Sequence, residues 1–473
     1  MDSRLMQLVV NGKKEDDNTY VYHIDGEDYL SMRQLADYLP FEMTIDENTN
    51  EILIKKKDTD EVPVRKQREL PEKADKVRSM IKKYEKRLYE INKSIFDHPE
   101  KGNQEHHACQ QLTSFLNEVG FEVIQGLEGK IPKEDKEVFL DTAFKAVIKG
   151  KEPGPVIAVM LEYDALPMGH ACGHNLIASS GMAAAIALAP LMKEVAGELW
   201  VMGTPAEEGG EYGGKIPLLH AGQFEGVDIA LITHPGDRWD TGADFLAISG
   251  AQIEFTGKPS HASAAPEKGI SALDAAIIAY NSIEMMREHS RSDARIHGII
   301  KEGGTASNIV PERAVLSYAV RALDQPYVEV LKSKIENCVE AGAVATGALG
   351  KVDWSFGYSA PINVAELDHM VLDYARLLNI NEIKQWEALG SSDLGNIGYE
   401  IPTCNLWFKI TPEGVLPHTH AFLEASGSKD GFQSALAAGE VLAFSALELF
   451  ENHEMVSLIQ QKFHKEKESL LSQ

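Results

Sequence analysis

The sequence predicts an α/β fold built on a mostly parallel sheet with helices on its faces. Two observations carry this prediction. Strand-like and helix-like segments alternate between residues 121 and 235, which is typical of parallel sheets. Within that region, four apolar runs have the length of strands and are separated by helical or turn-rich segments; they span 143–148, 156–161, 198–202 and 229–232.

Length and composition limit the class of protein. The chain has 473 residues, so we expect two or three domains. It carries 46 Lys and Arg against 72 Asp and Glu, a net charge of −26, which argues against nucleic acid and anionic lipid as partners. The four cysteines lack paired spacing, so no disulfide framework is predicted. No apolar run has transmembrane length and the first residues lack a signal pattern, so we expect a cytoplasmic protein, or an envelope-associated one if a signal segment has been removed.

Residues 1–56 are predicted to form a small separate α+β module. It contains a short helix at 32–38 and three short strands, at 8–10, 20–24 and 51–54. The pattern NGKKE…YVYHIDGEDYLSMRQLADYLPFEMTIDENTNEILIKK resembles a copper-amine-oxidase-type N-terminal module, and this resemblance implies no copper. Residues 57–73 are rich in charge and contain two prolines, so we interpret them as a linker.

The remaining chain reads as one domain interrupted by another. Residues 247–357, which we call the lid, show the order strand, helix, strand, strand, helix, strand of a ferredoxin-like unit. An α/β pattern precedes the lid and resumes after it, so residues 74–246 and 358–473 are predicted to form one domain. The other predicted helices and strand lie at 77–95, 105–119, 178–188, 368–378, 401–408 and 426–450.

Side chains that bind metals or move protons gather where the predicted strands end. In open α/β sheets, ligands bind at the carboxyl ends of the strands. Four groups occupy such positions: Asp164 with Cys172 and His174, then Glu207 with Glu208, then His234, and last His418 with His420. Taken singly, each has a structural explanation, such as a buried cysteine, a capping aspartate or a surface glutamate pair. Taken together, thiol, imidazole and carboxylate favour zinc or a similar metal over calcium or magnesium.

Six motifs between about residue 75 and the C-terminus resemble a known family. They are LEYDALPMGHACGHN, GTPAEEGGEYGGK, GKPSHASAAPEKG, GGTASNIVPERAVLSYAVRA, SSDLGNIGYEIPT and LPHTHAF. The set is similar to the aminoacylase/carboxypeptidase-type metallopeptidases, and within them to the amidohydrolase branch that includes aminobenzoyl-glutamate utilisation proteins and β-alanyl-lysine-type dipeptidases. The resemblance implies a zinc-peptidase-like catalytic domain with an inserted lid and dimerisation domain. It also implies two divalent metal ions, which are Zn²⁺ or one of Mn²⁺, Co²⁺ and Ni²⁺. The implied reaction is hydrolysis of the amide bond of a small N-acyl amino acid or dipeptide.

The resemblance also assigns roles to residues at the metal centre. Cys172 stands where the wider family has a bridging aspartate, and the other implied metal ligands are His174, Glu208, His234 and His418. His420 occupies the place of a usual proline, so the choice between His418 and His420 stays open. Glu207 matches the general base, and Asp164 matches the acid that orients a ligand. His170 is left with a structural role.

Further residues are implied to contact the substrate. His261 in the lid matches a histidine that reaches the active site of a partner subunit and polarises the scissile carbonyl. Asn308 and Arg321 match substrate-binding positions, although Arg321 is equally well explained as a surface charge on a strand. Ser392 and Asp393 match a loop near the active-site floor that either supports the residues of the site or positions substrate, and Asp393 has a cap as its alternative role.

Two alternatives to this function remain open on the sequence. The acyl group differs among the relatives, so folate fragments, β-alanyl dipeptides and N-acyl aromatic amino acids all stay candidates. A catalytically inactive binding or scaffold protein on the same fold is the alternative of another class, but the retention of Glu207 beside five ligand candidates favours an enzyme. An exposed edge strand of the lid could pair with its twin, so a homodimer is predicted.

Overall fold

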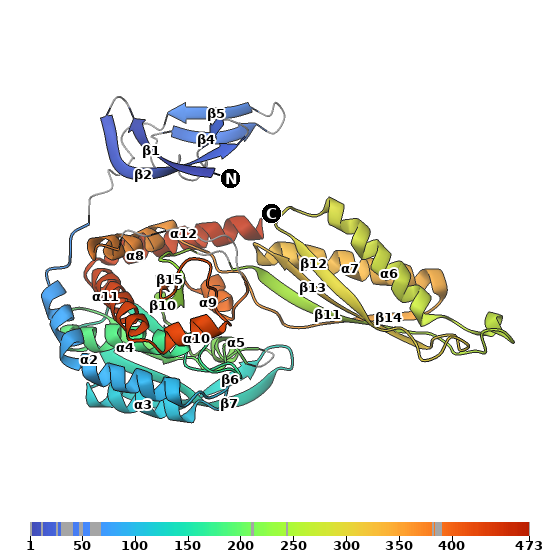
Figure 1. Cartoon of the computed structure of the whole chain (residues 1–473), viewed down its shortest axis with the longest axis horizontal. Helices are drawn as coiled ribbons and strands as arrows, with labels where there is room; N and C mark the ends of the chain where they lie inside the picture. Colours follow the sequence, from blue (N-terminus) through green and yellow to red (C-terminus); the bar gives the residue numbers. More distant parts are fainter. Residues whose placement is uncertain are drawn as a thin grey trace. The chain divides into compact units, whose positions relative to one another are not determined.

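The computed structural model describes residues 68–472 except 210–211, 243–244, 381–382 and 384–389, together with five strands among the first 56 residues (Figure 1). The chain divides into two compact units, Met1–Arg68 and Glu69–Gln473. The domain bounds predicted from the sequence stay predictions.

The first unit contains strands that pair antiparallel. One sheet has the order β1-β2-β3 and a second pairs β4 with β5. The strands predicted at 8–10, 20–24 and 51–54 lie within β1, β2 and β5, whereas β3 and β4 were not predicted. The predicted helix at 32–38 and residues 57–67 of the predicted linker lie outside the described residues. The bounds are β1 Asp2–Val10, β2 Lys13–Ile24, β3 Glu27–Tyr29, β4 Phe41–Asp46 and β5 Glu51–Lys56.

A six-stranded sheet in the order β15-β10-β8-β9-β7-β6 forms the centre of the second unit. β15, β10, β8 and β9 run parallel, while β7 and β6 are antiparallel to their neighbours. The short connection between β6 and β7 requires this, because a tight hairpin can join only antiparallel strands. The sheet is therefore mixed at one edge, and β6 was not predicted. The strands are β6 Glu122–Ile131, β7 Lys136–Lys149, β8 Val156–Leu161, β9 Glu198–Gly203, β10 Ile229–Gly236 and β15 Thr403–Lys409.

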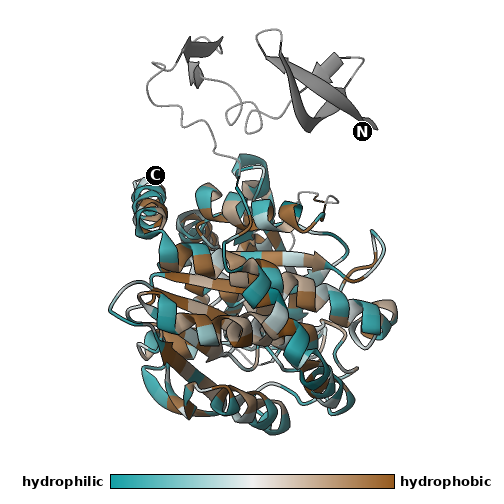
Figure 2. Ribbon diagram, turned by 90° about the vertical axis from the view of Figure 1, so that its left-hand side faces the viewer, coloured by the Kyte–Doolittle hydropathy of each residue, from teal (hydrophilic) through white to brown (hydrophobic). Residues whose placement is uncertain are grey.

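Both faces of this sheet are buried, as the continuous apolar strand sequences require. In β8, Ile157 and Val159 belong to one hydrophobic core while Ala158 and Met160 belong to another. The first core is formed with α2, α3, α4, α8 and α11, and the second with α5 and α9. Figure 2 shows the apolar strands enclosed between these helices. The helices are α2 Ala74–Asp97, α3 His106–Glu118, α4 His174–Leu188, α5 Lys215–His220, α8 Ala365–Leu377, α9 Leu394–Glu400 and α11 Lys429–Glu451.

Helix α4 lies at the centre of the first core, and every residue in it is buried. Its small residues let α4 pack closely against β8, because a Cβ at Gly181 would lie only 2.1 Å from Leu161 Cδ2. The segment His174–Glu194, which adds the 3₁₀ turn Ala189–Glu194 to α4, has the length and hydropathy of a membrane span, and 94% of its most apolar window is buried inside the protein.

The lid contains a four-stranded antiparallel sheet in the order β12-β13-β11-β14. Helices α6 and α7 pack on one face of it, as Figure 1 shows, so the predicted ferredoxin-like unit is confirmed. Where the chain enters and leaves the lid, Ile248 and Tyr358 exchange two backbone hydrogen bonds of 2.8 and 3.0 Å. The elements are β11 Ala247–Thr256, α6 Ala272–Met286, β12 Arg295–Glu302, β13 Arg313–Ala322, α7 Gln325–Thr346 and β14 Leu349–Trp354, with 3₁₀ turns at Pro266–Lys268 and Arg287–His289.

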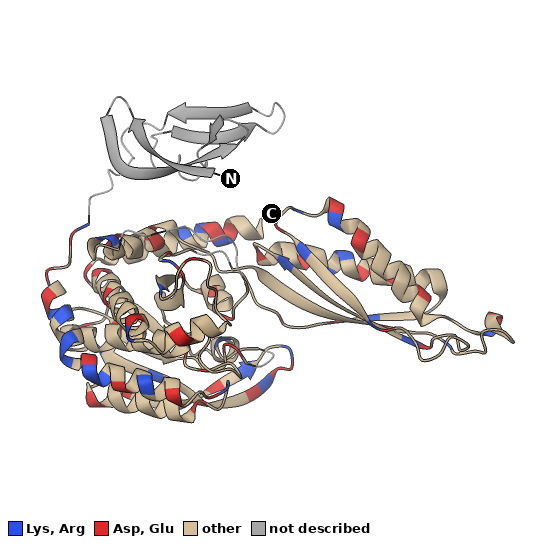
Figure 3. Ribbon diagram, viewed as in Figure 1, with Lys and Arg blue, Asp and Glu red and all other residues tan. Residues whose placement is uncertain are grey.

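The sequence did not predict the last helix, α12 His453–Leu471, or the short α10 His420–Ser426. Only Val456, Ile459 and Phe463 of α12 are buried, so its apolar stripe is narrow. Acidic and basic residues are interspersed along α2 and α12 (Figure 3), and ion pairs such as Lys82–Glu85 at 2.6 Å lie on the surface of α2. Such exposed pairs stabilise the fold by at most about 1 kcal/mol each.

Candidate metal centre

The carboxyl ends of β8, β9, β10 and β15 bring six potential metal ligands together. They form three overlapping groups, within each of which the ligand atoms lie within 4.8 Å of one another. Cys172, His174 and Glu208 each belong to two of these groups, so the three groups form one continuous cluster. The groups are Cys172 with His174 and His234, Cys172 with Glu208 and His418, and His174 with Glu207 and Glu208.

A sharp turn lets Cys172 and His174 face the same cluster. Gly173 between them has a φ of +80° and precedes the first residue of α4. A Cβ at this position would lie 2.6 Å from Pro235 Cγ, so the turn requires glycine. Cys172 Sγ then lies 3.5 Å from His234 Nε2. Side chains two residues apart diverge on a regular helix, so the turn at Gly173 is what allows Cys172 and His174 to converge.

Asp164 orients the ring of His174. Its Oδ1 accepts a hydrogen bond of 2.7 Å from His174 Nδ1, and its Oδ2 accepts one of 2.8 Å from the backbone N–H of Glu208. Burial alone would raise the pKa of Asp164, but His174 outweighs it and holds that pKa below its usual range. The other ring nitrogen, Nε2, is buried, lies 3.6 Å from Glu162 Oε2 and makes no hydrogen bond among the described residues. A histidine held at Nδ1 by a carboxylate, with Nε2 left free, is the usual arrangement of a metal ligand.

His234 is presented in the same way. Its Nδ1 donates to its neighbour's carbonyl, Pro235 O, at 2.8 Å, which leaves Nε2 facing Cys172. The ring of Trp407 on β15 lies 4.4 Å from the imidazole, centroid to centroid. Burial lowers the pKa of His234 to about 4, so the imidazole is neutral at pH 7, the form that binds metals.

The adjacent Glu207 and Glu208 point to different partners. Glu208 Oε1 lies 2.8 Å from His418 Nε2. Glu207 Oε1 accepts a hydrogen bond of 2.6 Å from Ser392 Oγ. Burial raises the pKa of Glu207 to about 8, and the charges of Glu162 and Asp393 add to this effect. Burial would also raise the pKa of Glu208, but hydrogen bonding and nearby histidines lower it to about 2. Two neighbouring carboxylates thus have very different acidities, which permits different roles.

The structure distinguishes His418 from His420. His418 has a φ of +68°, and its backbone N–H donates to Ala171 O at 2.9 Å, which ties it to the turn that carries Cys172. Both histidines are exposed, but His420, which begins α10, belongs to none of the metal-binding groups among the described residues. The geometry therefore favours His418 as the last ligand.

The predicted lid histidine, His261, belongs to none of the metal-binding groups among the described residues. His261 is exposed, and its Nδ1 accepts from the backbone N–H groups of Ser263 and Ala264 at 3.3 and 3.2 Å. Asn308 is exposed beside it, where its carbonyl accepts from Ala262 N at 3.0 Å. Arg321 lies on β13, where its guanidinium donates to Ser391 Oγ at 3.3 Å, so it is not simply a surface charge.

A buried ion-pair network lies behind the cluster, and the sequence did not predict it. Lys215, at the start of α5, lies between Glu162 and Asp393, with 2.6 Å to an oxygen of each. Asp393, predicted to contact substrate or to cap, is instead fully buried and does not cap α9, because both its oxygens accept from Lys215. No sequence signal marks Lys215 for burial, because lysine is usually exposed.

Two more buried polar residues support the strands and loops near the cluster. Glu105, which the sequence did not single out, accepts from Thr142 Oγ1 and from the backbone N–H of Ala206. The buried His170 contacts Ile95 O at 3.1 Å, as its structural role implies.

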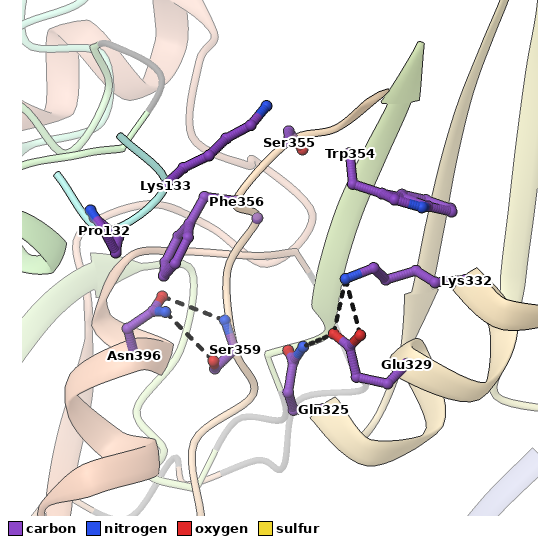
Figure 4. Close-up of a pocket in the computed structure, with 11 residues that line it drawn as sticks. Pro132, Lys133, Gln325, Glu329, Lys332, Trp354, Ser355, Phe356, Ser359 and Asn396 are labelled. Carbon is purple, nitrogen blue, oxygen red and sulfur yellow. Dashed lines mark hydrogen bonds and ion pairs between the residues drawn. The ribbon is translucent and has the colours of Figure 1, made fainter. Parts of the chain in front are cut away.

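A hollow of about 370 Å³ lies elsewhere, at the junction of the lid and the catalytic sheet (Figure 4). Lys133 from the β6–β7 turn and Trp354 from β14 line it, and Asn396 from α9 bonds Ser359 on its wall. Lys133 also forms an ion pair of 3.1 Å with Asp353. Since none of its lining residues belongs to the metal cluster, this hollow is separate from the candidate centre.

Comparison with known proteins identifies the family. Residues 247–346 match the peptidase dimerisation domain. The chain is 34% identical over 396 residues to the Xaa-Arg dipeptidase of Mus musculus, an alignment that covers 80% of this chain and 89% of the relative. The chain belongs to the M20 peptidase family. It is therefore a metal-dependent hydrolase that acts on amide C–N bonds, as predicted, and its lid contains the family's dimerisation domain.

Two further M20-type relatives extend the comparison. One of the subunits of the p-aminobenzoyl-glutamate hydrolase of Escherichia coli K12 is 33% identical over 285 residues, which covers 55% of this chain and 56% of that protein. A dinuclear metal-binding M20 peptidase of Bacillus subtilis has the same fold, with a TM-score of 0.61, 22% identity, and coverage of 78% of this chain and 99% of that one. The resemblance of residues 1–56 to a copper-amine-oxidase-type module is not supported by these comparisons.

Proposed function

We propose that this protein is a dinuclear M20 dipeptidase or N-acyl amino acid hydrolase with Cys172, His174, Glu208, His234 and His418 as its metal ligands. The observation that carries the proposal is the buried Nε2 of His174, which is fixed by Asp164 and has no hydrogen-bond partner among the described residues. The cluster around it offers one thiol, three imidazoles and a carboxylate, a set that fits Zn²⁺ or Mn²⁺, Co²⁺ and Ni²⁺. Cys172 belongs to two of the three groups, which supports its assignment as a ligand.

The residues around the metals supply the rest of the chemistry. When bound, the two ions would lower the pKa of a water and polarise the scissile carbonyl. Glu207, as a carboxylate, takes the proton from the attacking water and later gives it to the leaving amine. Asp164 keeps His174 in one tautomer and also holds the backbone of Glu208.

Substrate contacts complete the proposal. Arg321 and Asn308 would bind the carboxylate of the substrate, Arg321 from the base of the lid beside Ser391. The exposed His261 is placed on a lid loop where a second copy of the chain could receive it, so we propose a homodimer in which this imidazole serves the partner's site. Because the similar proteins are an Xaa-Arg dipeptidase and a p-aminobenzoyl-glutamate hydrolase subunit, an Xaa-Arg dipeptide and p-aminobenzoyl-glutamate should be tested first as substrates. A cytoplasmic location remains a prediction.

A substrate panel tests this function. Protein stripped with a chelator and reloaded with Zn²⁺, Mn²⁺, Co²⁺ or Ni²⁺ is assayed with Xaa-Arg, Xaa-Lys and β-alanyl dipeptides, p-aminobenzoyl-glutamate and N-acetyl amino acids. Glu207→Gln is the matched control, which should keep the metal and lose roughly 10²–10⁴-fold in rate. Failure of the folded, metal-loaded dimer to hydrolyse any member would overturn the proposal and favour an inactive binding or scaffold protein. Light scattering of the same sample tests the homodimer.

A further inference from the structure

Lys215 is a fully buried lysine that ties together three segments behind the metal cluster. Its Nζ lies 2.6 Å from Glu162 Oε1, just beyond the end of β8, and 2.6 Å from Asp393 Oδ1, which precedes α9. Its backbone N–H donates to Asp393 Oδ2 at 3.0 Å. A buried charge persists only when it is paired, so this arrangement must form for α5 to pack here.

A close backbone approach at Gly213 also packs against the carboxylate of Asp393. Gly213 has a φ of +61°, and a Cβ on it would lie 2.3 Å from Asp393 Oδ2. The turn that follows is closed by backbone bonds from Gly395 N to Ser392 O and from Asn396 N to Asp393 O, of 3.0 and 3.1 Å. Lys215 thus holds the turn that carries Ser392.

Ser392 transmits this position to Glu207. Its Oγ donates to Glu207 Oε1 at 2.6 Å and accepts from the backbone N–H of Leu394 at 3.2 Å. A serine hydroxyl has a single proton to donate. Because that proton is used on Glu207, Ser392 cannot donate it to a substrate at the same time.

We propose that Lys215, Asp393 and Ser392 are positioning residues that fix the carboxylate of Glu207, and that Ser392 is not a substrate-binding residue. This inference rests on the proposed role of Glu207 as the base. With one oxygen held by Ser392, Glu207 presents the other oxygen to the attacking water in one orientation. The hydrogen bond between Ser392 and Glu207 therefore affects the rate of proton transfer, whereas substrate affinity depends on residues of the lid.

A double-mutant cycle between Ser392 and Glu207 tests the proposal. On an alanyl-arginine dipeptide, or the panel member with the highest rate, Ser392→Ala should lower kcat roughly 10- to 100-fold, as expected for a lost hydrogen bond to a charged group, with KM changed less than about threefold. Ser392→Thr, which keeps the hydroxyl, should restore most of the rate. In a Glu207→Gln background, Ser392→Ala should lower kcat by less than about twofold, because its target is already lost.

The outcomes separate this inference from the proposed function. A rise in KM on Ser392→Ala, with the full effect repeated in the Glu207→Gln background, would overturn the positioning role and restore a substrate contact. Undiminished activity of Glu207→Gln itself would overturn the proposed function instead.

Asp393→Asn extends the test to the buried pair. It should reproduce the fall in kcat of Ser392→Ala while metal content, measured by elemental analysis, stays at the wild-type value. Lys215→Met is made in parallel, and if it fails to fold, Asp393→Asn and Ser392→Ala still decide the question. Lys82→Met, which removes the exposed ion pair with Glu85, is the matched control and should leave kcat unchanged. A folded Asp393→Asn variant with wild-type kcat would refute the part played by Lys215 and Asp393.

Discussion

The carboxyl of Glu105, which is fully buried, predicts how the stability of this protein depends on pH. Its Oε1 accepts from Ala206 N at 2.8 Å and its Oε2 from Thr142 Oγ1 at 2.9 Å. Burial raises the pKa of Glu105 from 4.5 to about 7, and the charge of Asp164 adds to this. Ala206 has a φ of +59° and precedes Glu207, so Glu105 also anchors the loop that carries the proposed base.

The size and sign of the effect follow from linkage. Because the pKa is higher in the folded protein, folding favours the protonated acid. That stabilisation is complete below about pH 4.5 and is lost as pH rises through about 7. A shift of this size corresponds to about 3 kcal/mol, since each pKa unit is worth about 1.4 kcal/mol. For a chain of this length, that is roughly 3–5 °C in melting temperature.

Glu105→Gln isolates this contribution. The amide keeps an acceptor for Ala206 N and offers a donor to Thr142, but it does not titrate. Thermal melts of chelator-treated wild type and variant are recorded between pH 5 and 9. The melting temperature of the variant minus that of the wild type should increase by roughly 3–5 °C from the low to the high end of this range. Melting temperatures that run parallel over this range would refute the reasoning, because Glu105 would then titrate alike in the folded and unfolded chain.

Three further predictions concern the metal centre. Cys172→Ala should lower the metal content found by elemental analysis, and unchanged occupancy would remove Cys172 from the ligands. His418→Ala should do the same while His420→Ala retains full occupancy, because, of these two histidines, His418 alone lies within reach of Cys172 and Glu208; equal losses would contradict the geometry. Gly173→Ala should lower both metal content and melting temperature, because the left-handed φ costs about 1–2 kcal/mol and the new Cβ would overlap Pro235; a wild-type melt would show that the turn adapts.

The sequence was most informative where the fold obeys a general rule. Parallel strands place their carboxyl ends at one edge, so Cys172, Glu208 and His234 could be expected to meet before any coordinate was known. The ferredoxin-like lid followed equally well from its order of strands and helices. The edge strand β6 was missed because its exposed, polar residues lack the apolar pattern of the inner strands.

Other features depend on tertiary packing and left no local pattern. Nothing around Lys215 in the sequence shows that Glu162 and Asp393, at distant positions, enclose it. The position of His418 beside the cluster depends on a positive φ and on one backbone bond to Ala171. The lid residues His261 and Asn308 are exposed, which is what a site completed by a second subunit would require.

The backbone pairing of Ile248 with Tyr358 limits how the lid can rotate relative to the catalytic sheet. The segment that enters the lid and the segment that leaves it lie side by side, joined by the two hydrogen bonds between Ile248 and Tyr358. The two connections would therefore act as a single hinge. Rotation about that hinge would stretch first the contacts on either side of it, namely Lys133 with Asp353 and Arg321 with Ser391. Any such rotation would act on Ser391, the residue next to the Ser392 that holds Glu207.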